Sequence, residues 1–207
     1  MKNLRLFFIF IITFVTVYPL SADPRACVGN DTVVSPENSS RNLMSYLKGT
    51  WTTSGSWQIL EGEGKIKKLI KTRIIGTETF TTILDGHFLQ KTLSSKVKYH
   101  SRDLDKIIQI PFSSMTIFTF NENVSKYYYW LYDSTGAFLE AGGNFNQDQN
   151  QYTFTSLIVN EDGMEIENML TITIVDDDHY RWESKEREKG ASTWNPAATG
   201  LSTRKRS

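Results

Sequence analysis

The stretch SKYYYWLYDSTGAFLEAGGNF, residues 125–145, holds two segments rich in aromatic and apolar side chains with a polar break between them. The break is Asp133-Ser134-Thr135-Gly136, and these four residue types favour tight turns. Two strands joined by so short a connection run antiparallel, because parallel strands need a crossover of about a dozen residues. The stretch therefore predicts a β-hairpin.

The same pattern of strand and short polar break recurs along the chain after Gly49. The other breaks are EGEG at 61–64, NENVS at 121–125, NQDQN at 146–150, NEDG at 160–163 and DDD at 176–178. Residues 100–114, HSRDLDKIIQIPFSS, form a longer connection that we expect to be irregular. About nine or ten strands result, with no helices between them that could connect parallel neighbours. We predict an all-β, up-and-down antiparallel β-barrel, because closure removes the exposed edges of a long sheet.

The N-terminal residues carry the pattern of a secretory signal peptide. Lys2 and Arg5 precede an apolar run at 6–17, and the small residues Ser21 and Ala22 end the segment. The run is shorter than the roughly 20 apolar residues that a membrane-spanning helix needs. We therefore expect residues 1–22 to be removed and the mature protein to be secreted into the periplasm. A lipoprotein anchored through Cys27 is the less favoured alternative.

Domain boundaries follow from composition and from one helix signal. Residues 23–35 are expected to form a flexible lead-in. The sequence Ser35-Pro36-Glu37 combines an N-cap, a first-turn proline and a first-turn acid, which predicts a short helix over residues 36–47 at one end of the barrel. We assign residues 36–190 to the barrel domain with this helix. Residues 191–207, rich in Pro, Gly, Ser and Thr, are expected to be a disordered tail.

Gly49-Thr50-Trp51, placed after the short helix, resembles the G-x-W opening of the lipocalin and wider calycin barrels. Further similarity lies in ILDGHFLQK at 83–91, in the aromatic hairpin, and in DGMEIENMLTITIVDDDHYRWE at 162–183. Together these segments resemble a large bacterial family of secreted calycin-like barrels whose function is unknown. The resemblance extends over residues 43–187, implies the barrel fold, and brings no catalytic motif.

Alternation of side chains between the two faces of a strand predicts the barrel interior. Lys126 is expected to face solvent, so alternate residues from Tyr127 onward should point inward. The same reasoning for the other strands gives the candidates for a ligand cavity, which are Trp51, Trp57, Tyr127, Tyr129, Leu131, Asn168, Tyr180 and Trp182. The buried amide of Asn168 needs a hydrogen-bond partner, which a tyrosine hydroxyl, a water or a ligand could supply.

The outward face of the aromatic strand carries a second set of large side chains, Tyr128, Trp130 and Tyr132. Large apolar stripes on a protein surface are usually covered or used in an interaction. We expect cover from within the chain, either from the apolar connection at 104–112 or from the N-terminal helix. A protein partner or a membrane surface is the alternative.

Composition and motifs argue against several classes of function. Basic and acidic residues balance at 23 each, which gives no indication of a nucleic-acid partner. The sequence lacks a G-x-S-x-G motif. His87, His100 and His179 stand far apart, so neither a metal site nor a cofactor is predicted. Cys27 is the only cysteine, which excludes an internal disulfide, and no segment after the leader is long and apolar enough to span a membrane.

We expect a secreted binding protein that holds a small apolar or amphipathic ligand in the barrel. One alternative is a structural or interaction protein of the cell envelope with a filled barrel and no ligand. A second alternative is an enzyme that uses tyrosine and glutamate groups, namely Tyr127, Tyr129, Tyr180 and Glu140. No catalytic residue is assigned from the sequence. The volume of the cavity would separate the first two hypotheses.

Overall fold

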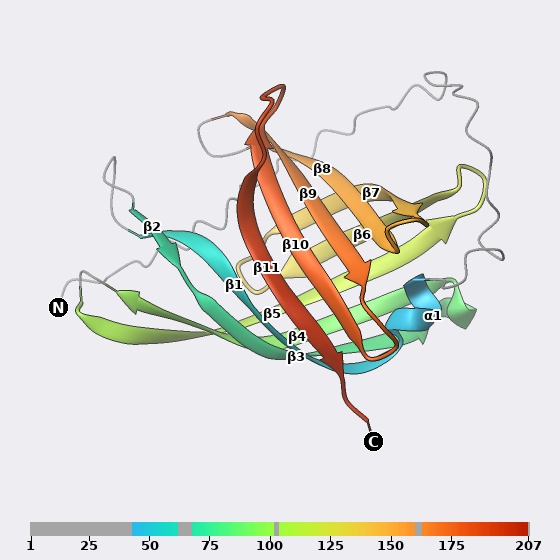
Figure 1. The fold of residues 1–207 in the computed structure, drawn as a ribbon, viewed down its shortest axis with the longest axis horizontal. Helices are drawn as coiled ribbons and strands as arrows, with labels where there is room; N and C mark the ends of the chain where they lie inside the picture. The colour runs from blue at the N-terminus through green and yellow to red at the C-terminus, as the bar shows by residue number, and fades with distance from the viewer. Residues whose placement is uncertain (1–42, 62–67, 102–103, 160–162, 207) are drawn as a thin grey trace.

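A computed structural model describes residues 43–61, 68–101, 104–159 and 163–206 (Figure 1). Within these ranges the chain forms one short α-helix, one 3-10 helix and eleven strands. The elements are α1 (Leu43–Leu47), β1 (Gly49–Glu61), β2 (Lys68–Lys71), β3 (Arg73–Ile83), η2 (Leu84–Gly86), β4 (Phe88–Ser101), β5 (Lys106–Asn121), β6 (Lys126–Asp133), β7 (Phe138–Asn146), β8 (Gln151–Val159), β9 (Glu165–Ile174), β10 (His179–Glu188) and β11 (Asn195–Arg204).

The eleven strands belong to one antiparallel sheet, in which each strand from β3 to β11 pairs with the next along the chain. Strand β1 pairs with β3 on one side and with β11 on the other, which closes ten strands into a barrel. The extra strand is β2, which pairs with the end of β1. The predicted all-β, up-and-down antiparallel barrel with a short helix is confirmed.

The closing strand β11 lies where the sequence predicts a disordered tail, and that prediction is wrong for residues 195–204. This segment pairs with β10 along one edge and with β1 along the other (Figure 1). Its small residues are compatible with a strand because a tryptophan ring packs on them. A Cβ atom on Gly200 would lie 2.2 Å from the ring of Trp182. The barrel domain therefore extends to Arg204 rather than ending at residue 190.

The sequence predicts an irregular connection at residues 100–114, and the described residues of this range, 100–101 and 104–114, belong instead to a long hairpin. Strand β4 has 14 residues and β5 has 16, and they pair over the whole of β4. Alternation continues into this region, with Phe112 buried and Ile107 71% exposed. Strand β6 pairs with β5 only from Ser114 onward, so the hairpin of β4 and β5 continues beyond its neighbour.

Helix α1 packs into one end of the barrel. Leu43 and Leu47 are fully buried in the main apolar cluster, which also contains Trp51. Trp51 Nε1 donates a hydrogen bond of 2.7 Å to the carbonyl oxygen of Leu47, and the ring of Tyr46 lies 5.5 Å from the Trp51 ring. The predicted position of the helix at a barrel end is confirmed. The predicted signal peptide, the lead-in and the start of the helix lie in residues 1–42, outside the described residues.

Among the residues that the structure describes, no helix has the length and apolar character needed to cross a membrane.

Candidate functional site

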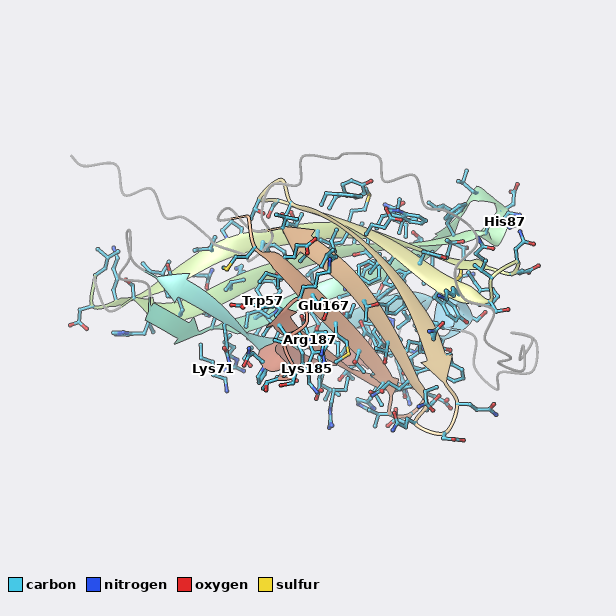
Figure 2. All side chains as sticks on the ribbon, turned by 90° about the horizontal axis from the view of Figure 1, so that it is seen from above. Trp57, Lys71, His87, Glu167, Lys185 and Arg187 are labelled. Carbon is cyan, nitrogen blue, oxygen red and sulfur yellow. The ribbon has the colours of Figure 1, made fainter. Side chains whose placement is uncertain are left out.

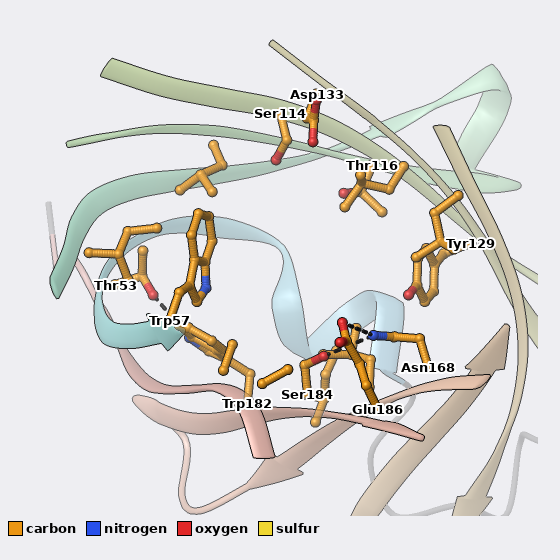
Figure 3. A pocket seen from close by; sticks show the side chains of 18 of the residues that line it. Thr53, Trp57, Ser114, Thr116, Tyr129, Asp133, Asn168, Trp182, Ser184 and Glu186 are labelled. Carbon is orange, nitrogen blue, oxygen red and sulfur yellow. Dashed lines mark hydrogen bonds between the residues drawn. The ribbon is translucent and has the colours of Figure 1, made fainter. Parts of the chain in front are cut away.

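The interior of the barrel contains a cavity of about 500 Å³. Side chains from opposite walls point into this space (Figure 3). The apolar part of the lining includes Trp57, Ile74, Phe80, Leu93, Phe112, Phe118, Leu131, Leu139, Ile158, Ile166, Leu170, Ile172 and Trp182. A concave, mostly apolar space of this size is the usual form of a small-molecule site.

Six of the eight residues predicted for the cavity line it. They are Trp57, Tyr129, Leu131, Asn168, Tyr180 and Trp182. Trp51 and Tyr127 are buried as expected, but they belong to the cluster around α1 and are not among the lining residues. The alternation along β6 is as predicted, since Tyr127 and Tyr129 are 3% and 2% exposed. Contact of these residues with a ligand stays a prediction.

Two tryptophans form one side of the cavity. Trp182 Nε1 donates a hydrogen bond of 3.1 Å to Thr53 Oγ1, and Trp57 stands beside it in Figure 3. The Trp182 ring lies against the backbone at the point where β1 and β11 pair Gly55 with Gly200. A Cβ atom at either glycine would lie less than 3 Å from this ring. The two glycines therefore create the space that the indole occupies.

A buried charged cluster around Glu78 forms another part of the wall. Lys91 Nζ lies 2.7 Å from Glu78 Oε1. The hydroxyl groups of Tyr180 and Ser202 both donate hydrogen bonds to Glu78 Oε2, the second at 2.8 Å. The side chain of Glu78 is 3% exposed and that of Lys91 is 20% exposed. Proteins tolerate a buried charge when it is paired and hydrogen-bonded, and this carboxylate is both.

The surroundings of this cluster shift two pKa values in opposite directions. Burial by itself raises the pKa of Glu78, but the charge of Lys91 and the hydrogen bonds from Lys91, Tyr180 and Ser202 outweigh it and lower this pKa below its ordinary value of 4.5. Burial, reinforced by the Glu78 carboxylate, raises the pKa of Tyr180 well above its ordinary value. Near neutral pH the glutamate is therefore charged and the tyrosine keeps its proton.

The sequence-based candidates do not include Glu78 and Lys91, although strand alternation contained the signal. Glu78 has the same parity as Phe80, which is buried, and Lys91 has the same parity as Leu89 and Leu93. A charged residue at an inward position of a barrel strand needs a partner nearby. This rule could have identified the pair before the structure was known.

A second polar group involves Asn168, Ser184 and Glu186 on β9 and β10 (Figure 3). Asn168 Nδ2 donates hydrogen bonds to Ser184 Oγ at 3.1 Å and to Glu186 Oε1 at 3.4 Å. The predicted burial of Asn168 is confirmed, and its partners come from the neighbouring strand rather than from a tyrosine hydroxyl. Burial raises the pKa of Glu186, and the hydrogen bond from Asn168 offsets only part of this shift.

A third polar group lies on the facing wall, where β5 and β6 place Ser114, Thr116 and Asp133 (Figure 3). Asp133 Oδ1 accepts hydrogen bonds from the backbone N–H groups of Thr135 at 2.8 Å and Ala137 at 3.2 Å, which hold the turn after β6. Asp133 Oδ2 and Thr116 Oγ1 are buried and have no hydrogen-bond partner among the described residues. The hydrogen bonds that these two oxygen atoms could form are therefore not supplied by the described residues.

The outward aromatic set Tyr128, Trp130 and Tyr132 lies on the other face of β6. The rings of Tyr128 and Trp130 stack with centroids 6.5 Å apart, and Tyr132 is 44% exposed. Neither of the two predicted covers lies over this face in the described part of the chain. Residues 106–112 form part of the β4–β5 hairpin, and α1 packs inside the barrel. An interaction partner at this face stays a prediction.

The three histidines considered as metal ligands are not among the residues that line the cavity. Glu140, the acid of the enzyme hypothesis, is not among them either. His179, the first residue of β10, has its Nδ1 2.8 Å from Asp176 Oδ1 in the preceding turn, and Figure 2 places His87 at the far end of the molecule from Trp57. Among the described residues, no three His, Cys, Asp or Glu side chains converge as metal ligands would. Glu140 is exposed on the outer face of β7, so its proposed role as a cavity group is wrong.

Comparisons with known proteins place the chain with one family of undetermined function. A family model described as "Protein of unknown function (DUF1579)" matches residues 36–204. Among solved structures, an S-type phycobiliprotein lyase, CPES from Guillardia theta, is similar with a TM-score of 0.45. The two sequences are 11% identical, and the match covers 79% of this chain and 91% of the lyase chain. No curated protein matches the sequence.

Proposed function

The chain belongs to the DUF1579 family, whose function is unknown, and we propose that it binds a small, predominantly apolar or amphipathic molecule inside the barrel. The observation that carries this proposal is the cavity of about 500 Å³, which lies within the usual range for small-molecule sites. Its walls combine a majority of apolar side chains with a few polar groups. Apolar burial would supply the affinity, at about 25 cal/mol per Å² of surface removed from water, and the polar groups would orient the ligand.

The alternative of a filled barrel is less well supported by the packing. Trp57 and Trp182 stand along one side of the interior and leave the centre open (Figure 3). In well-packed protein interiors, voids larger than a water molecule are few. A cavity many times that size lowers the stability of the folded protein, and a bound molecule that fills it would offset this loss.

One feature favours the enzyme alternative, since Glu78, Lys91 and Tyr180 converge in the cavity wall and the pKa values of Glu78 and Tyr180 are shifted. Their directions argue against acid–base chemistry, however. General acid–base catalysis works best when the pKa of the group lies near the working pH. The pKa of Glu78 is lowered and that of Tyr180 is raised, so both move away from neutrality. The pairing of Lys91 and Tyr180 with Glu78 is better explained by the need to stabilise a buried carboxylate in the barrel wall.

A dye-binding titration tests the proposal. N-phenyl-1-naphthylamine is a neutral, apolar dye whose fluorescence rises in apolar surroundings, and we expect saturable binding at a single site. Leu131→Trp places an indole in the cavity, because Leu131 lines it. Met115→Trp adds the same ring on the outer face of the neighbouring strand, where Met115 is paired with Tyr132. Circular dichroism would verify that both variants keep the barrel.

Leu131→Trp should weaken dye binding by about tenfold or more, whereas Met115→Trp should leave it unchanged. Absence of saturable binding to the unmodified protein would contradict the proposal. Equal binding by the two variants would also contradict it, because the dye would then lie outside the cavity.

We also propose that the mature protein is exported and lacks residues 1–22. The support is the basic start, the short apolar run and the small residues at Ser21 and Ala22. N-terminal sequencing of the protein from its own host should find Asp23 as the first residue. A chain that retains Met1 and remains in the cytoplasm would contradict export.

A further inference from the structure

Two buried polar atoms on the β5–β6 wall lack partners. Thr116 is 2% exposed, and neither its Oγ1 nor Asp133 Oδ2 has a hydrogen-bond partner among the described residues. Most buried polar atoms in proteins are satisfied, and those that are not reduce stability unless a water or a ligand pairs with them. Both residues line the cavity and the two atoms lie just beneath its surface, so a small rotation of either side chain would bring them into contact with a molecule there.

The register of the two strands brings these atoms to one place. Ser114 is paired directly with Asp133, and Thr116 is paired with Leu131, two positions along the same face. Diagonal neighbours on one face of an antiparallel pair lie about 7–8 Å apart, so a ligand head group placed between the two side chains can contact both. Figure 3 shows Ser114, Thr116 and Asp133 along one wall of the cavity. The methyl groups of Leu131 supply an apolar contact beside them.

The chemistry of this wall favours a hydrogen-bond donor. An ionised carboxylate can only accept hydrogen bonds. Among the described residues, no Lys, Arg or His forms an ion pair with Asp133. Lys91 is the cross-strand neighbour of Thr116, but its ammonium is paired with Glu78. The positive charge that this part of the cavity lacks would have to come from a ligand.

The opposite wall adds acceptor capacity. Glu186 also lines the cavity, and one of its oxygens already accepts a hydrogen bond from Asn168. A further cavity carboxylate, Glu78, has its charge balanced by Lys91. Asp133 and Glu186 therefore leave the cavity with an excess of negative charge. Arg187 contributes little to balance it, because its guanidinium forms an ion pair with Glu167.

The position of Asp133 fits the head group of an amphipathic molecule. Asp133 ends β6, whereas Tyr127, near the start of that strand, packs in the cluster around α1. Asp133 thus lies toward the barrel end opposite the helix, where the exposed residues Glu188 and Asn195 also border the cavity. A charged head group held there loses less hydration than one buried deep among Phe80 and Phe118.

We propose that the natural ligand carries a hydrogen-bond-donating head group, an amine in its cationic form, that pairs with Asp133 Oδ2 and Thr116 Oγ1 while its apolar part extends toward α1. This assignment rests on the proposed binding function and specifies the chemistry of its ligand. No covalent step is involved. The selectivity arises from one charge-assisted hydrogen bond and from the repulsion that the same carboxylate exerts on an anionic head group.

Displacement of N-phenyl-1-naphthylamine by three ten-carbon molecules tests this assignment. Decylamine, decan-1-ol and decanoate have the same chain and differ in the charge of the head group at pH 7.4. Decylamine should displace the dye at a concentration about tenfold or more below that of decanoate. Asp133→Asn should remove most of this preference. The substitution keeps an acceptor at Oδ1 for Thr135 and Ala137, so the turn should persist.

Two further variants separate ligand recognition from folding. Thr116→Val removes only the unpartnered hydroxyl, so the urea midpoint should hold or rise while displacement by decylamine requires a higher concentration. Asp148→Asn removes a carboxylate in the exposed turn at 146–150 and should change neither property. A lower midpoint for Thr116→Val would mean that the hydroxyl has a structural partner and would overturn the assignment.

The outcomes for the ligand class and for the binding function are distinguishable. If the dye binds and decanoate displaces it as well as decylamine does, the amine assignment is overturned and the binding function stands. If Asp133→Asn keeps the full preference for decylamine, the assigned residue is wrong. If the dye and all three molecules fail to bind, the binding function itself fails.

Discussion

Replacing Glu78 by glutamine should strongly destabilise the barrel while preserving its shape. The 3% exposed carboxylate is paired with Lys91 and accepts hydrogen bonds from Tyr180 and Ser202. Glutamine can still accept from the hydroxyl groups, but it offers no negative charge to the ammonium group. Removing one partner of a buried ion pair costs about 3–5 kcal/mol. Because Lys91 keeps 20% exposure, we expect the lower end, about 3 kcal/mol.

Urea unfolding followed by tryptophan fluorescence would measure this loss in the free energy of unfolding. Lys91→Met should also destabilise, since it leaves the carboxylate of Glu78 without its counter-ion. The double variant removes both charges, so neither partner is left as an uncompensated buried charge as it is in each single variant. We therefore expect the double variant to be about 2–3 kcal/mol more stable than the sum of the single effects predicts.

The pH dependence gives the same prediction a second readout. Because the pKa of Glu78 is lowered in the folded state, its stabilising effect is fully present above its ordinary value of 4.5. The effect is lost as the pH falls through the folded-state pKa. The difference in unfolding free energy between the unmodified protein and Glu78→Gln should therefore be constant above pH 4.5 and shrink as the pH falls below 4.5.

Lys96→Gln is the matched control, because Lys96 lies on the exposed face of β4, the strand that carries Lys91. This substitution should change the unfolding free energy by no more than about 0.5 kcal/mol. The reasoning is refuted if Glu78→Gln falls within the same small range, or if the two single effects simply add. Either result would mean that the pair does not form in a buried environment.

Three further substitutions test other parts of the structure by the same unfolding assay. Gly200→Ala should cost about 1–3 kcal/mol and shift the tryptophan emission, because the added Cβ would lie 2.2 Å from the Trp182 ring; an unchanged midpoint would show that β11 does not pack under this ring. Arg204→Met should cost about 2–4 kcal/mol, because the guanidinium donates hydrogen bonds to two carbonyl groups of the α1 segment, at 2.6 and 2.7 Å, and lies 4.1 Å from the Trp51 ring, whereas the exposed neighbour Lys205→Met should cost little. Glu186→Gln should be more stable than the unmodified protein at neutral pH, because burial raises the pKa of Glu186 and the folded state disfavours its charge; this difference should narrow as the pH falls through the raised folded-state pKa and be closed below pH 4.5, and a loss of stability at neutral pH would contradict this.

Strand alternation made the barrel and much of its interior predictable from the sequence. Lys126 identifies the outer face of its strand, and the buried positions of Tyr127 and Tyr129 follow from it. Asn168 was placed inside by the same rule. Its partners were not predictable, because Ser184 and Glu186 become its neighbours only through the register of β9 and β10.

Composition was a poor guide where small side chains serve a packing partner far away in the sequence. Gly200 and its neighbours are typical of a flexible tail, yet they form the strand that closes the barrel under Trp182. The charged pair of Glu78 and Lys91 was missed for a related reason. Motif searches look for groups of catalytic or metal-binding residues, whereas this pair is visible only when each strand is checked for charges on its inward face.

Native mass spectrometry of the protein purified from its own host tests the central claim most directly, which is that the barrel is hollow and holds a small molecule. We predict a species heavier than the chain by the mass of one small molecule, which is lost on unfolding and is depleted in Leu131→Trp but not in Met115→Trp. A bare chain mass in all three proteins, unchanged after incubation with decylamine, decan-1-ol or decanoate, would contradict the account.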